Sequence, residues 1–111
     1  MNRQELNDIL IQVLVDGQPI EVWYDHFVAT PQKPTIAPPF ILYHSNSTDT
    51  FKADGIVWDK DINYIVELCV DKIDESLETQ IENLFDTNEI IYEKDENFLE
   101  SERMYQITYY I

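Results

Sequence analysis

The sequence predicts an α+β fold: a mostly antiparallel sheet with two helices packed on it. Two segments, residues 3–15 and 72–86, have the apolar spacing of amphipathic helices, and short apolar runs typical of strands lie between and after them. The order helix, strands, helix, two strands favours helices packed on an antiparallel sheet. A chain of 111 residues is expected to form a single domain, residues 1–111, around one core.

The first half of the chain is expected to contain one helix and two strands. Leu6, Ile9, Leu10, Val13 and Leu14 recur at helical spacing over residues 3–15. The segment Asp16–Pro19 is expected to end this helix, because Gly tolerates a left-handed C-terminal turn and Pro cannot continue a helix. Strands are predicted at residues 20–24 and 40–44, and a polar loop at residues 45–49 ends the second one.

A hairpin is predicted over residues 51–71, with a short strand at 56–58 and a turn at 59–61. Its second strand has the clearest pattern in the chain, because apolar residues at every even position from 62 to 70 alternate with a mixed set. One face of this strand is therefore uniformly apolar and must be covered.

The predicted cover is the helix at residues 72–86, whose apolar stripe includes Leu77 and Ile81 and which Thr87-Asn88 should end. Two final strands are predicted at residues 90–94 and 103–111. They should flank an acidic loop at residues 95–100.

Composition limits the possible functions. The chain has 22 acidic and 7 basic side chains and a net charge of −15, yet 44% of its residues are hydrophobic, too many for a disordered acidic tail. No apolar run is long enough for a membrane helix, and we expect no signal peptide, no membrane partner and a cytoplasmic location. General nucleic-acid binding is disfavoured because it depends on Lys and Arg, so charged partners should be basic.

The acidic residues concentrate in the second half of the chain. Residues 59–111 carry a net charge of −11, against −4 for residues 1–58. A helical stripe with no basic partner is predicted to face solvent: Asp71, Glu75, Glu78, Glu82 and Asp86. It is interpreted either as a solubilising surface or as a face toward a DNA channel or a basic partner.

No catalytic or metal-binding constellation stands out, and the chain is not expected to be an enzyme or to hold a cofactor. Cys69 lies in an apolar strand between Glu67 and Asp71, where a reactive thiolate is disfavoured. His26 and His44 lack the spacing of a metal site, and the carboxylates lack that of a calcium loop.

A Pro-rich arm or loop is predicted at about residues 28–39, because its four prolines exclude both a helix and an inner strand. Aromatic residues crowd around it and the following hairpin, and they are candidates for a subunit or partner interface. They are Trp23, Tyr24, Phe27, Phe40, Phe51 and Trp58.

Several motifs follow the amphipathic N-terminal segment in a defined order. They are VWYDHF at 22–27, PPFI at 38–41 with Tyr43 after it, FKAD at 51–54, VEL at 66–68 leading to Asp71-Lys72, and ESERMYQI at 100–107. Over nearly the whole chain, this set resembles the small tail-terminator, or tail-completion, proteins of siphophages and prophages of Gram-positive bacteria.

The resemblance implies a structural virion protein that is not an enzyme. Such subunits form a hexameric ring that caps the head-proximal end of the tail, stops polymerisation of the tail-tube protein and docks the head-completion or connector protein. The protein would be made in the host cytoplasm, would be a monomer when isolated, and would end in the virion tail with DNA passing as non-sticking cargo. High acidity suits a DNA channel but opposes closure of the ring.

An acidic inhibitor remains an alternative from the residues alone. In that interpretation the acidic stripe and nearby aromatic residues imitate DNA and occupy the basic site of a nuclease or similar protein. Such an inhibitor would bind its partner with a steep salt dependence, whereas a terminator would bind the ends of tail tubes.

Overall fold

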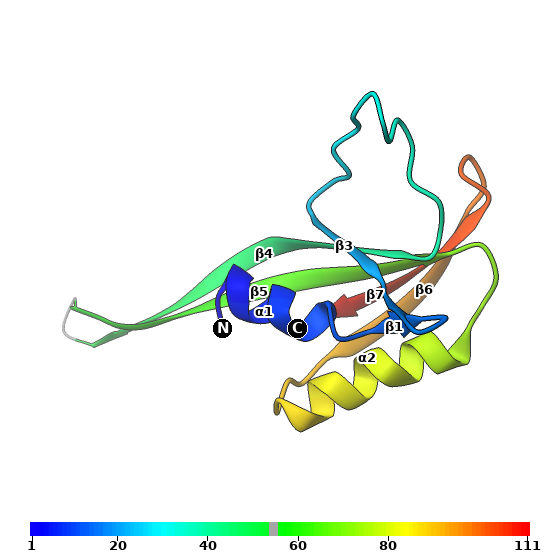
Figure 1. Ribbon diagram of the computed structural model, residues 1–111. Helices are drawn as coiled ribbons and strands as arrows, with labels where there is room; N and C mark the ends of the chain where they lie inside the picture. Colours follow the sequence, from blue (N-terminus) through cyan, green and yellow to red (C-terminus); the bar gives the residue numbers. More distant parts are fainter. Residues whose placement is uncertain (54–55) are drawn as a thin grey trace.

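The computed structural model describes the backbone of residues 1–53 and 56–111 and the side chains of residues 1–46 and 62–111. In this part of the chain the helices are α1 (Arg3–Leu10) and α2 (Glu75–Thr87). The strands are β1 (Leu14–Val15), β2 (Gln18–Pro19), β3 (Glu21–Tyr24), β4 (Phe40–Ala53), β5 (Ile56–Val70), β6 (Glu93–Leu99) and β7 (Met104–Tyr110). Both helices lie on the same side of the main sheet, which confirms the predicted α+β fold (Figure 1).

The main sheet has the strand order β3-β4-β5-β7-β6, and β5 lies at its centre. The pairs β4–β5, β5–β7 and β6–β7 are antiparallel, whereas β3 runs parallel to β4. Residues 25–39, which contain the predicted Pro-rich arm, form the crossover that this parallel pair requires, and they contain neither helix nor strand. The arm therefore returns the chain to the end of the sheet at which β3 began, and β4 starts there.

The core lies between the helices and the helix-facing side of β4, β5 and β7. The alternation predicted for β5 is confirmed from Tyr64 to Val70, because Tyr64, Val66, Leu68 and Val70 are all buried there, whereas Ile62, which the prediction also included, is exposed. Their cross-strand neighbours on this side are also buried: Ile41, Tyr43, Ile107 and Tyr109. The helices close the core with Leu6, Ile9 and Leu10 from α1 and Leu77, Ile81 and Phe85 from α2.

The first helix is shorter than predicted. It ends at Leu10, and the following residues form the small β1–β2 hairpin. Asp16 and Gly17 have φ angles of 50° and 79° and occupy its turn. Asp-Gly suits this turn because a tight two-residue hairpin needs two left-handed positions, so the Asp-Gly pair reverses a strand instead of ending the helix.

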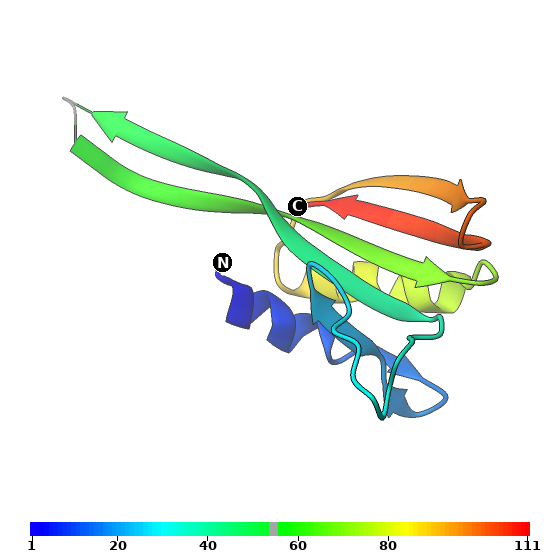
Figure 2. The same cartoon turned by 90° about the horizontal axis from the view of Figure 1, so that it is seen from above.

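The predicted loop at residues 45–49 and the predicted turn at 59–61 are wrong, because β4 and β5 run through both segments. One end of β4 pairs with β3, and the matching end of β5 pairs with β7. Among the described residues, the rest of β4 and β5 pair only with each other. They form a two-stranded ribbon, residues 45–53 and 56–63, that extends away from the helices (Figure 2). Apolar spacing indicates which residues are buried and not which strands pair. It therefore cannot reveal a polar strand that lies outside the core.

Two boundaries in the second half also differ from the prediction. Helix α2 begins at Glu75 and not at residue 72, because Asp74 accepts hydrogen bonds from the backbone N–H groups of Ser76 and Leu77 and caps the helix. The predicted acidic loop at 95–100 is mostly strand β6, at the edge of the sheet. Charged residues are common on edge strands, where they discourage pairing with other chains.

Replacement of Gly17 should measure the free-energy cost of the left-handed backbone conformation without a steric clash. A Cβ at Gly17 would have no atom within 4 Å, so Gly17→Ala adds backbone strain and no clash. We expect a loss of about 1 kcal/mol in the free energy of unfolding. Gly17→Asn should lose less, because Asn tolerates this conformation. Urea denaturation of both variants tests this, and equal losses would contradict the assignment of the turn.

Candidate interaction surface

The sheet has a second face, opposite the helices, which we call the open face. Strand register places its residues in three cross-strand rows that include β4 and β5, and it places Leu99 and Met104 in a further row on β6 and β7. The three rows are Glu21, Phe40, Cys69, Gln106 and Asn97; Trp23, Leu42, Glu67, Thr108 and Asp95; and His44, Ile65, Tyr110 and Glu93. Seen from above, α2 lies behind β4 and β5, and the crossover of residues 25–39 lies beside β4 at one edge of the sheet (Figure 2).

The β3–β4 side of the open face is apolar. The rings of Trp23 and Phe27 meet edge to face, with their centroids 5.0 Å apart, and both side chains are half-buried. Phe40 of β4, in the neighbouring row, is buried. Leu42 of β4 and Ile65 of the adjacent strand β5 are half-buried. The Pro-rich crossover rises from this edge on the side opposite the helices (Figure 1). This part of the open face thus combines rigid aromatic rings with aliphatic side chains.

The β7–β6 side of the open face is mixed: its acidic residues are Glu93 and Asp95, and Tyr110, Met104 and Leu99 add apolar groups. Glu67 accepts a hydrogen bond of 2.9 Å from the Gln106 amide, and its second oxygen lies 3.4 Å from His44 Nε2. Glu93 and Asp95 on the edge strand are exposed. None of the described strand positions on this face holds Lys or Arg, and Lys33 of the crossover pairs with Glu21. The open face therefore gains negative charge toward the β6 edge, where Glu93 and Asp95 lie.

The six aromatic residues predicted for an interface do not form one cluster. Trp23 and Phe40 share the open face, and Phe27 packs against Trp23. Tyr24 lies on the helix-facing side instead, where its ring packs against Tyr43 and under the Arg3 guanidinium. The side chains of Phe51 and Trp58 lie outside the described residues. The alternation of mixed residues on β5 is the sequence signal for Ile65 and Glu67, which the prediction had not singled out.

The predicted acidic stripe is not a continuous solvent-facing surface. Asp71 precedes α2, and only Glu75 and Asp86 of the helical members are exposed. Glu78 is buried, with 6% of its surface exposed, and Glu82 is half-buried. The prediction that the stripe has no basic partner is wrong, because Lys94 of β6 lies 2.6 Å from Glu78 and 3.0 Å from Glu82. The helical spacing of the acids could not reveal Lys94, because this residue comes close to α2 only when β6 pairs with β7.

The Lys94 ion pairs belong to a larger polar network between α2 and the last strands. Glu82 also accepts hydrogen bonds from the hydroxyls of Tyr109, at 2.8 Å, and Tyr92, at 3.1 Å. Burial opposes the charge on Lys94, but its hydrogen bonds to Glu78 and Glu82 outweigh this effect and raise its pKa to about 12. Burial likewise opposes the charge on Glu82, but its bonds to Lys94 and Tyr109 lower its pKa below the ordinary value. The network thus holds one cation between two carboxylates.

The residues considered for catalysis are not combined into a site. Burial, and secondarily Glu67, raises the pKa of the Cys69 thiol to about 12, so its thiolate is scarce at neutral pH. His26 pairs with its neighbour Asp25 on the exposed crossover, far along the chain from His44 and Glu67. Within the described residues, no group of three or more His, Cys, Asp or Glu side chains is placed to hold a metal ion.

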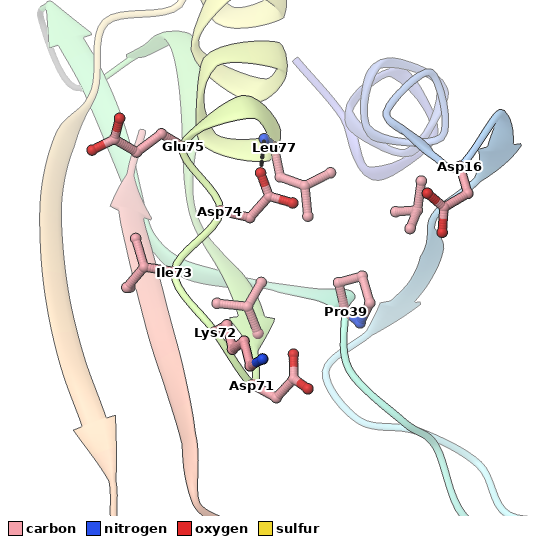
Figure 3. A pocket seen from close by; sticks show the side chains of 10 residues that line it. Asp16, Pro39, Asp71, Lys72, Ile73, Asp74, Glu75 and Leu77 are labelled. Carbon is pink, nitrogen blue, oxygen red and sulfur yellow. Dashed lines mark hydrogen bonds between the residues drawn. The ribbon is translucent and has the colours of Figure 1, made fainter.

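An open hollow of about 650 Å³ lies where the β1–β2 turn, the end of β5 and the start of α2 meet (Figure 3). Asp16, Asp71, Asp74 and Glu75 line it together with Lys72. Asp74 is already engaged as the helix cap. The hollow thus combines these charged groups with apolar side chains such as Pro39, Ile73 and Leu77.

Comparison with known proteins assigns no family to the chain. No protein-family model matches it, and no curated protein is detectably similar to it in sequence. None of the helices in the described part of the chain is long and apolar enough to span a membrane. The inference about function therefore depends on the surfaces described above and on the motifs in the sequence.

Removal of the Lys94 charge should destabilise the fold. Lys94→Met leaves the buried Glu78 carboxylate without this partner. We expect a loss of about 1–3 kcal/mol in the free energy of unfolding, because breaking a fully buried pair costs about 3–5 kcal/mol and solvent partly screens this one. Lys72→Met, at an exposed loop position, is the matched control and should change stability by less than about 0.5 kcal/mol. Equal effects in chemical denaturation would contradict the network.

The contribution of Glu82 should depend on pH. Because the folded state lowers the pKa of Glu82, its charged form stabilises the fold fully above the ordinary value of 4.5. This contribution is lost as the pH falls through the lowered folded value. The stability difference between the wild type and Glu82→Gln should therefore be largest near neutral pH and shrink below pH 4.5. The exposed Glu75→Gln should show a much smaller change over the same pH series.

Proposed function

We propose that this protein is a structural subunit at the head-proximal end of a phage tail. In this role it caps the tail tube, stops polymerisation of the tail-tube protein and docks the head-completion or connector protein. It would be made in the host cytoplasm and built into the virion as a ring, with the hexamer as the expected form. The resemblance of the ordered sequence motifs to those of tail-terminator proteins supports this proposal.

The two-stranded ribbon of β4 and β5 is the observation that carries the proposal. An isolated two-stranded hairpin is marginally stable in water and usually needs a third strand or a packed layer. The molecule measures 51 × 31 × 27 Å along its principal axes, and the ribbon extends from one end of the sheet (Figure 2). A ribbon that reaches a neighbouring copy would give the head-to-tail contact from which closed rings are built.

Charge is consistent with a weakly associating subunit. A net charge of −15 on every copy opposes closure of a ring, and screening by salt reduces this repulsion. The same charge would keep the DNA phosphate backbone from adhering as it passes. We therefore expect the isolated protein to be monomeric when dilute and to assemble with rising ionic strength or on contact with the tail tube.

An acidic inhibitor that imitates DNA is less well supported. That interpretation depends on a row of free carboxylates along α2. Glu78 and Glu82 are engaged by Lys94, and Asp71 lies outside the helix. The remaining two helical acids, Glu75 and Asp86, give a poor imitation of a phosphate backbone.

The test mixes the purified protein with the tail-tube protein of the genome that encodes it. Tube length is measured by electron microscopy. The wild type should shorten the tubes and bind at their ends. A variant in which residues 47–61 are replaced by Asn-Gly should keep its cooperative melting transition and lose this effect, because the ribbon is gone while the five-stranded sheet remains. His26→Ala, on the exposed crossover, is the control and should act like the wild type. Unchanged tube lengths with folded wild-type protein would refute the proposal.

A further inference from the structure

The open face is unusual for a sheet face that meets only water. Antiparallel sheets often have one solvated face, and its residues are then mostly polar. Here Trp23 of β3, Leu42 of β4 and Ile65 of β5 are all only half-buried, and Phe40 in the neighbouring row of β4 is buried. Tyr110, in the same row as Ile65, is 43% exposed. These side chains form a contiguous apolar area on adjacent strands.

Negative charge borders this apolar area and limits what can cover it. Glu67 lies directly across from Leu42 in the strand register, and Asp95 and Glu93 lie two strands further on. A second copy placed face to face would bring the same carboxylates together, and no described strand position on this face supplies a balancing cation. Charge complementarity therefore selects a basic partner over another copy of this chain.

The dimensions of the face favour a helix as the covering element. Neighbouring strands are about 4.8 Å apart and a helix is about 10 Å wide, so one helix covers two or three strands. The opposite face is already covered in this way by α1 and α2 (Figure 1). A helix with an apolar stripe toward Leu42 and Ile65 can direct Lys or Arg side chains, which bury their stems and extend their charges, toward Glu67 and Asp95.

We propose that the open face docks an amphipathic, basic helix of another protein. The helix packs its apolar stripe on Trp23, Leu42 and Ile65 and pairs its cations with Glu67, Asp95 and Glu93. Docking adds a third layer to the fold, with helices on both sides of the sheet. This inference goes beyond the proposed function, because it holds whether or not the chain ends a phage tail.

The probe is a synthetic amphipathic helix of about 18 residues built from Leu and Lys, long enough to span the sheet at about 1.5 Å per residue. Its counterpart of Leu and Glu removes the basic charge, and one of Ser and Lys removes the apolar stripe. Amide NMR shifts of the wild-type protein map each contact, and calorimetry at about 0.15 M salt gives the affinity. We expect the Leu–Lys peptide to shift β4, β5 and β7, and both counterparts to leave these strands unchanged.

Two charge-reversal pairs separate a local contact from general attraction to an acidic protein. Glu93→Lys with Asp95→Lys changes the open face, and Asp8→Lys with Asp86→Lys makes the same charge change at exposed positions on the two helices. The first pair should weaken binding at least tenfold and the second less than threefold. Equal losses, or shifts confined to α1 and α2, would overturn the proposal. Concentration-dependent shifts on the open face without peptide would also overturn it, in favour of a second copy.

These outcomes are independent of the tail-tube experiment. A protein that caps tubes but does not bind the peptide refutes only the docking proposal. A protein that binds the peptide on its open face but leaves tubes unchanged refutes only the proposed function.

Discussion

The central strand β5 is the element on which the rest of the structure depends. Its even-numbered residues from Tyr64 to Val70 are buried on one side, and strands on both flanks continue that apolar surface. Burial of apolar area contributes about 25 cal/mol per Å², so this surface must be covered for the domain to be stable. Both helices are used for this purpose. Because they share one side of the sheet, the other side remains open.

An acidic chain also needs a way to hold its last strands against α2. Lys94 does this at one point, with its ammonium between Glu78 and Glu82, while the Tyr92 and Tyr109 hydroxyls donate hydrogen bonds to Glu82. Removing these charges from water is costly, and the arrangement is favourable only because every partner is present. Two of the carboxylates in the acidic half thus serve the fold, while Glu93 and Asp95 remain for contacts outside it.

The ribbon and the open face are two different surfaces with different demands. The ribbon extends strand pairing beyond the core and suits contact with a neighbouring subunit. The open face combines an apolar area with carboxylates and suits a basic partner. A subunit with both surfaces can join copies of itself through one and another protein through the other, which is what a terminal ring in an assembly requires.

The α+β class, the amphipathic faces of both helices and the buried side of β5 could be predicted from residue spacing, because apolar periodicity reports burial directly. Capping by Asp74 and the Asp16-Gly17 turn were also encoded locally, although the second was interpreted as a helix end. The length of β4 and β5, the pairing of β6 and the partner of Glu78 and Glu82 depend on contacts between distant segments and could not be predicted in this way. Strand pairing outside the core leaves no apolar pattern, and Lys94 reaches α2 only because β6 pairs with β7 at the edge of the sheet.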